Sequence, residues 1–306
     1  MGNRADLSTA SVGAAERRQL LSSLQFTERE IVVADLSTTV QEAGEGTPIV
    51  LLHGPAATGI HWMRLMNDLA TTHRVLVPDL PGHGATRGRT EHGRGDAFES
   101  ERMVRWLAEL IERVAGAPAI LAGHALGGAL AARLAIRHPR LVDGLILVDT
   151  FGLTALEPPP AFASAIQDFV REPSRRTHDG LWRFCAFDLD SLRQRMGAQW
   201  ETFATFNVAM AVRPEAAEAV GALMQQFGGA IPPGELSSIA APTTLVWGRH
   251  DLATPLAVAE RASARYGWSL HVIEGAADDP LIEQPEALLR ALRVALRASP
   301  ARRSVS

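Results

Sequence analysis

Short apolar runs alternate with longer segments of helical spacing along most of this chain, and this alternation restricts the fold more than any other feature. The apolar runs in the first half are residues 47–54, 74–80, 118–123 and 142–150. The segments with helical spacing between them are residues 60–73, 96–116 and 126–139. Apolar strands that alternate with helices are typical of a parallel sheet covered by helices on both faces. We therefore expect an α/β fold with a mostly parallel central sheet.

The alternation stops after Gly152 and resumes near the C-terminus. Residues 153–236 contain proline clusters and aromatic-rich helical segments but no apolar strand. Strands are expected again at 243–248 and 269–275, with helices at 253–266 and 281–298. The predicted organisation is an N-terminal extension (1–28), a core in two parts (29–152 and 237–299), an inserted helical cap (153–236) and a C-terminal tail (300–306).

Composition excludes several classes of function. The net charge is -4 and no basic or acidic block is present, so we expect no nucleic-acid partner and no anionic membrane partner. The single cysteine, Cys185, excludes an intrachain disulfide and a metal site with several thiolates. All 30 basic residues are arginine, which excludes a catalytic Schiff-base lysine and a P-loop. We expect no cofactor and no metal.

Location and assembly are less constrained by the sequence. The N-terminal residues contain no apolar segment of the kind that a secretory signal has, and no apolar run is long enough to span a bilayer. A cytoplasmic location is the resulting expectation. The sequence leaves the oligomeric state open.

Four motifs follow predicted strands, and their order carries a family resemblance. They read "LLHGPAATGIHW", "VPDLPGHGAT", "LAGHALGG" and "VWGRHDLATP". In this order, across about residues 29 to 299, they resemble the α/β-hydrolase fold, specifically the capped esterases, C–C bond hydrolases, epoxide hydrolases and haloalkane dehalogenases. The resemblance implies the fold, a cap at 153–236 and a ligand pocket between cap and sheet.

The nucleophile and the histidine of the family's catalytic triad are absent. The family places a serine or aspartate in a G-x-S-x-G turn, where this chain has Ala125 between Gly123 and Gly127. Asp251 stands at the position of the acid that orients the histidine. Asp278, in "GAADDP", stands where the histidine is expected. His271, the one histidine after Asp251, is expected near the far end of its strand and away from the site.

The oxyanion hole also departs from the family pattern. The residue after His53 and Gly54 usually donates an N–H to the oxyanion, but here it is Pro55, which has no N–H. The N–H of Leu126 remains, and Ala56 is the candidate for a second donor. We expect His53 to brace a loop and His124 to pack beside the turn.

The carboxyl groups of Asp251 and Asp278 are the candidate catalytic pair. If the family fold holds, they lie where an Asp–His pair would be, and like-charge repulsion would raise one pKa and create a proton shuttle. The alternative is that the Asp278 loop has relaxed and faces solvent. A metal site between them is disfavoured because no third ligand of suitable type is evident.

Three functions remain open on the sequence. The first is an enzyme without a serine nucleophile that moves a proton in a small apolar carbonyl compound, in lyase-type or cyclase-type chemistry. The second is a non-catalytic protein that binds a small molecule, and the third is a hydrolase that activates water directly. The aromatic residues of the cap predict an apolar pocket in each case, so the expected partner is a small hydrophobic, aromatic or polyketide-like molecule.

Overall fold

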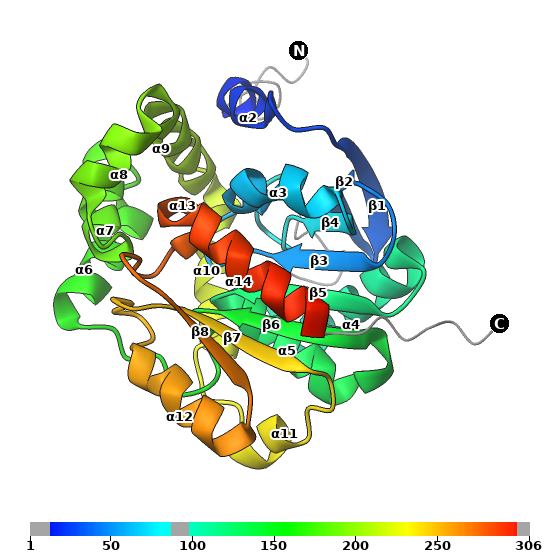
Figure 1. Ribbon diagram of the computed structural model, residues 1–306. Helices are drawn as coiled ribbons and strands as arrows, with labels where there is room; N and C mark the ends of the chain where they lie inside the picture. The colour runs from blue at the N-terminus through cyan, green and yellow to red at the C-terminus, as the bar shows by residue number, and fades with distance from the viewer. Residues whose placement is uncertain (1–12, 87–97, 299–306) are drawn as a thin grey trace.

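The computed structural model describes residues 13–86 and 98–298, which form one mostly parallel sheet flanked by helices (Figure 1). The strand order is β1-β2-β4-β3-β5-β6-β7-β8. The strands are β1 (Thr27–Val33), β2 (Leu36–Ala43), β3 (Pro48–Leu52), β4 (Arg74–Pro78), β5 (Ala119–His124), β6 (Val142–Val148), β7 (Thr243–Gly248) and β8 (Ser269–Ile273). β1 and β2 form an antiparallel hairpin, β2 runs antiparallel to β4, and every pair from β4 through β8 is parallel.

Helices cover both faces of the sheet, as the alternating pattern predicts. The helices on one face are α3 (Met63–Ala70), α13 (Pro280–Glu283) and α14 (Pro285–Ala298). The helices on the other are α4 (Ser100–Leu110), α5 (Leu126–Arg137) and α12 (Leu256–Tyr266). The central strands β3, β5 and β7 are buried along their whole length, which explains why they contain almost no charged residue. The expected α/β fold is confirmed.

A helical insertion lies between β6 and β7, in the segment that the sequence assigns to a cap, and we refer to it as the cap. Its helices are α6 (Pro160–Arg171), α7 (Arg175–Cys185), α8 (Leu189–Met196), α9 (Ala198–Ala211) and α10 (Pro214–Phe227), followed by α11 (Pro233–Ser237), which packs on α5. Most aromatic side chains of the cap are buried, whereas Phe187 is exposed. The chain before the sheet contributes to this region too, because helix α2 (Ala14–Leu21) packs against α9.

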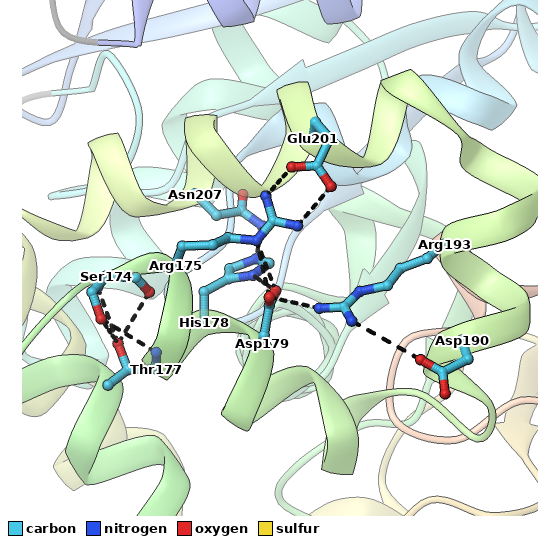
Figure 2. A network of polar contacts seen from close by, with 9 residues as sticks. All are labelled: Ser174, Arg175, Thr177, His178, Asp179, Asp190, Arg193, Glu201 and Asn207. Carbon is cyan, nitrogen blue, oxygen red and sulfur yellow. Dashed lines mark hydrogen bonds and ion pairs between the residues drawn. The ribbon is translucent and has the colours of Figure 1, made fainter.

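A polar network joins three of the cap helices (Figure 2). Arg175 of α7 forms a two-pronged ion pair with Glu201 of α9, and Asp179 of α7 pairs with Arg193 of α8 at 2.6 Å. Within it, the buried His178 ring bonds Asp179 through Nδ1 and Asn207 through Nε2. The network therefore fixes α7, α8 and α9 relative to one another.

Element boundaries differ from the expectations in small ways. The helix expected at 60–73 is a 3-10 turn (Gly59–Trp62) followed by α3, and the one at 281–298 is divided into α13 and α14. The helix expected at 96–116 is α4 followed by a π-helical turn (Ile111–Ala115), and its expected first residues lie outside the described residues. In the described ranges, none of the helices combines the length and apolar character that a bilayer span requires.

Candidate functional site

The turn from β5 into α5 has the geometry of a nucleophile elbow without a nucleophile. Ala125 has φ 48° and ψ −111°, a conformation that non-glycine residues rarely adopt. The flanking glycines permit this turn because a Cβ on Gly127 would lie 2.6 Å from the carbonyl oxygens of Leu52 and His53. A Cβ on Gly123 would likewise lie 2.5 Å from the Gly127 backbone. Close packing of α5 against β5 and β3 therefore imposes the strained turn, whatever side chain residue 125 has.

The Ala125 methyl group lies in apolar surroundings. Its exposed fraction is 2%, and it belongs to a core cluster that also contains Phe162 of the cap and Trp247 of β7. Phe162 in turn stacks on Phe184 with ring centroids 5.4 Å apart. A methyl group has no lone pair with which to attack a carbonyl, so this turn cannot form an acyl-enzyme.

In the loop after β3, the N–H of Ala56, the candidate second oxyanion donor, has an acceptor within the protein. The N–H of Ala56 donates to His83 Nε2 at 3.3 Å, while His83 Nδ1 lies 3.2 Å from the carbonyl of Pro81. Burial lowers the pKa of His83 to about 4, so its ring is neutral and can accept at Nε2. Pro55 has no N–H, and that of Ala56 is bonded to His83, so a role of Ala56 as oxyanion donor stays a prediction. Leu126 begins α5, where N–H groups have no acceptor within the helix.

His53 braces the loops, as expected. Its Nε2 accepts the N–H of Leu80 at 2.9 Å, and its Nδ1 lies 2.8 Å from the carbonyl of Gly54. Burial holds the pKa of His53 well below its usual value, so the ring is neutral. Gly54 has no room for a side chain, because a Cβ there would lie 2.9 Å from His124 Nδ1.

Asp251 is a buried carboxyl group held by its own loop. Its exposed fraction is 4%, and it accepts backbone N–H groups of Ala253 at 2.7 Å and Thr254 at 3.0 Å and the Thr254 hydroxyl at 2.5 Å. Burial raises its pKa to about 6, although these hydrogen bonds oppose the change. The adjacent His250 points elsewhere and stacks on Phe187 with ring centroids 4.1 Å apart.

Asp149, which follows β6, is the immediate carboxyl neighbour of Asp251 and was not singled out in the sequence. It is fully buried, and Oδ1 accepts the N–H of Gly248 at 2.8 Å. Burial, and next the charge of Asp251, raise the pKa of Asp149 well above its usual value. Hydrogen bonding from Asp149 is in turn among the influences that lower the pKa of Asp251. Asp149 Oδ2 is buried and has no hydrogen-bond partner among the described residues.

Asp278, which the sequence motif assigns to the family's histidine position, takes part in a contact between core and cap. Its N–H donates to the carbonyl of Cys185 at 3.2 Å. Its carbonyl lies 2.7 Å from His124 Nε2. Burial, and next the charge of Asp251, raise the pKa of Asp278 well above its usual value. In the part of the chain that the structure describes, no hydrogen bond joins the Asp251 and Asp278 carboxyl groups.

Glu283 also joins the cap to the core. Its carboxyl group accepts the N–H of Phe187 from the cap at 2.6 Å and that of Ala277 from the core at 2.7 Å. The Arg195 side chain of α8 donates to the Glu283 carbonyl at 3.1 Å. Burial raises the pKa of Glu283 to about 7. The cap is therefore bonded directly to the loop in which the family's histidine would lie.

An apolar groove opens beside the oxyanion loop, between core and cap. Its free volume is about 30 Å³, and its walls come from the loops after β3 and β4 and from α6, α9 and α10. The lining includes Ala56, Thr58, His83, Phe169, Met210 and Ala216. A volume of this size holds a water molecule or two rather than a ligand. No group of three or more His, Cys, Asp or Glu residues suited to a metal ion is found in residues 13–86 and 98–298.

Comparison with known proteins agrees with this architecture. Residues 49–291 match the model of the alpha/beta hydrolase family. The chain belongs to the α/β-hydrolase family. A pimeloyl-[acyl-carrier protein] methyl ester esterase of Edwardsiella ictaluri is 30% identical over 254 residues, which cover 80% of this chain and 91% of that protein. The enzyme of the same name from Nitrosospira multiformis is 37% identical, but over only 119 residues, which cover 39% of this chain and 44% of that protein.

A solved structure extends the likeness to the whole fold. The 2-hydroxy-6-oxo-6-phenylhexa-2,4-dienoate hydrolase from Rhodococcus sp. strain RHA1 superimposes with a TM-score of 0.77 and 21% identity, covering 89% of this chain and 99% of that one. At this identity the likeness establishes the fold alone. Both sequence relatives described above are named as esterases, while this chain has alanine at position 125.

Proposed function

We propose that this chain is a non-hydrolytic member of the α/β-hydrolase family that binds a small apolar molecule between cap and core without cleaving it. The observation that carries the proposal is Ala125, which occupies the strained elbow with a methyl group. Nucleophilic catalysis needs a nucleophile, a base within hydrogen-bonding reach and preorganised oxyanion donors. Asp278 stands in place of the base, and the Ala56 N–H is engaged by His83. Each of the three requirements is thus unmet or weakened.

The apolar groove beside Ala56 supports the choice of ligand. Its walls are mainly small and apolar, with Thr58, His83 and Arg213 as the polar and charged lining residues. Because its free volume is about 30 Å³, a ligand enters only if α6 and α10 move away from the loops after β3 and β4. The ligand class that fits is a compact aromatic or polyketide-like molecule, for which the surrounding aliphatic and aromatic side chains supply apolar contacts.

A thermal-shift screen of aromatic and polyketide-like compounds tests this proposal. A ligand that binds only the folded protein adds about 2.7 kcal/mol at a hundredfold excess over Kd. Ala216→Trp should fill the groove and abolish the response, whereas Ala264→Trp, on the exposed side of α12, should retain it. The proposal is wrong if no compound gives a saturable shift, or if both variants respond equally.

A second candidate function is proton transfer, and the buried carboxyl groups favour it. Asp149, Asp251 and Asp278 all have raised pKa values at the same end of the sheet, and Asp251 titrates near pH 6. A carboxyl group of this kind can take and return a proton at neutral pH. If a bound compound is converted, Asp278→Asn should slow turnover by about 10²–10⁴-fold with little change in affinity. Turnover at the parent rate would exclude Asp278 as the shuttle.

A further inference from the structure

A second cavity, polar rather than apolar, lies between α4, α5 and the segment that leads into α11. Its free volume is about 130 Å³, and it has no lining residue in common with the apolar groove. The polar part of its lining is Ser100, Glu101, Arg133, Arg137 and Glu235. None of these residues has a place in the proposed function, so the cavity requires its own explanation.

Arg133 is the partly buried cation of this cavity. Its Nη1 donates to the carbonyl of Ala129 at 3.2 Å, and its guanidinium carbon lies 4.8 Å from the centroid of the Phe227 ring. Burial lowers the pKa of Arg133, opposed by the charge of Glu235. Even so, no carboxylate in the described residues comes within ion-pair distance of its guanidinium. A guanidinium group has five N–H donors, and one of those in Arg133 has a protein acceptor.

Arg137, one helical turn further along α5, is neutralised instead. Its guanidinium lies 3.4 Å from Glu101 and 3.3 Å from Glu235. The exposed fraction of the side chain is 47% for Arg137, 67% for Glu101 and 38% for Glu235. Ion pairs this exposed contribute little stability, so Arg137 can exchange a carboxylate for another anion. The two carboxylates disfavour a large polyanion near the cavity. The charge left without an ion-pair partner is that of Arg133.

We propose that this cavity binds one compact oxyanion, a phosphate or carboxylate group, held by the free N–H groups of Arg133 and assisted by Arg137. A guanidinium presents two parallel N–H donors that match two oxygens of such a group, and charge-assisted bonds of this kind are among the strongest in proteins. Packing on Phe227 limits the motion of the Arg133 head, which reduces the entropy lost when the anion binds. A volume of about 130 Å³ has room for the anion and water around it.

Titration calorimetry on the full chain tests the site, with inorganic phosphate and acetate added separately at constant ionic strength maintained with sodium chloride. Saturable millimolar binding of at least one anion is expected. Arg133→Gln should weaken it about tenfold or more, since each hydrogen bond to a charged group contributes roughly 1.5–3 kcal/mol. Arg290→Gln, which removes an exposed arginine from α14, should bind as the parent does. A response to phosphate alone assigns a phosphate ligand, and a response to acetate alone assigns a carboxylate.

Arg133→Gln also removes the contact with Phe227, so a loss of binding in this variant could have two causes. A second measurement therefore uses the parent protein alone. Phenylglyoxal modifies accessible arginines, and peptide mass spectrometry follows each one. A bound anion should slow modification of Arg133 relative to Arg290 in the parent protein. The proposal is overturned if neither anion saturates, if both arginine variants bind equally, or if the anion protects Arg133 no more than Arg290.

Discussion

Replacing Asp251 with asparagine should stabilise the protein at neutral and alkaline pH. In the folded state burial raises the pKa of Asp251 from 3.8 to about 6, so the folded protein holds this proton more tightly than the unfolded chain does. The stability that the protonated group contributes is fully present below pH 3.8 and is lost as the pH rises through about 6. The difference between these two pKa values corresponds to about 3 kcal/mol.

Asparagine keeps the shape of the side chain without the titration. Its oxygen can still accept the N–H groups of Ala253 and Thr254, and its amide can donate to Thr254 Oγ1 or Asp149. The variant should therefore resemble the parent near pH 4, where Asp251 is protonated. Near pH 8 its free energy of unfolding should exceed that of the parent by up to about 3 kcal/mol.

Urea unfolding of parent and variant across this pH range gives the measurement. The difference between the two proteins reports residue 251 together with its coupling to Asp149 and Asp278, whose pKa values the charge of Asp251 raises. Asp35→Asn, at an exposed turn position where asparagine tolerates the positive φ of 63°, is the matched control and should show no rise between pH 4 and pH 8. If Asp251→Asn is instead destabilising, and more so at pH 8 than at pH 4, then Thr254 and the backbone N–H groups stabilise the carboxylate, and the reasoning from burial is refuted.

Three further outcomes are expected. A fluorophosphonate probe should label no residue stoichiometrically, because Ala125 has no hydroxyl group; mass-spectrometric mapping of one modified serine would show that another residue is the nucleophile. The double variant Ala125→Ser with Asp278→His should hydrolyse activated esters slowly, and either single change should not, since triad members act as a unit. If the double variant is inert, adding Pro55→Gly should restore an N–H donor and raise the rate, and no gain would locate the fault in the Asp278 loop. Asn207→Leu should lower the free energy of unfolding by about 1–3 kcal/mol, because it leaves His178 Nε2 without a partner. Urea unfolding measures this change, and the control Gln199→Leu, on the exposed side of α9, should leave the free energy of unfolding unchanged.

The fold was predictable from the sequence because its signal is local and repeated. The buried parallel strands read as mostly apolar runs, as in "PIVLL" of β3, and flanking helices such as α4 have an apolar stripe. The cap could be located because the strands stop after Val148 and resume at Thr243. The assignments of Ala125 to the elbow and of Asp278 to the histidine position rest on motif spacing, and they stay predictions.

The contacts of the site could not be predicted, because they join loops that are far apart in sequence. Nothing near Ala56 indicates that His83, 27 residues away, accepts its N–H. Nothing near Asp278 indicates that Cys185 of the cap lies against it. The sequence does contain a sign of Asp149, because this carboxylate directly follows the apolar run at the end of β6. Only the sheet order β5-β6-β7 shows that β6 lies beside β7, the strand that precedes Asp251.

The intact elbow does not by itself argue for catalysis. Its strain costs on the order of 1–3 kcal/mol and persists only where the surroundings impose it. Here the imposing contacts are those of Gly123, Gly127 and Gly128, whose missing side chains allow α5 to lie against β5, β3 and Thr150. These contacts hold the first helix after the sheet's central strand in place, so they are needed for folding even when residue 125 has no reactive group. A catalytic site differs from a turn kept for folding alone in whether the polar groups around it are free to bond a substrate. In this chain the Ala56 N–H donates to His83 and the Asp278 N–H donates to the Cys185 carbonyl, so both donors already have acceptors within the protein.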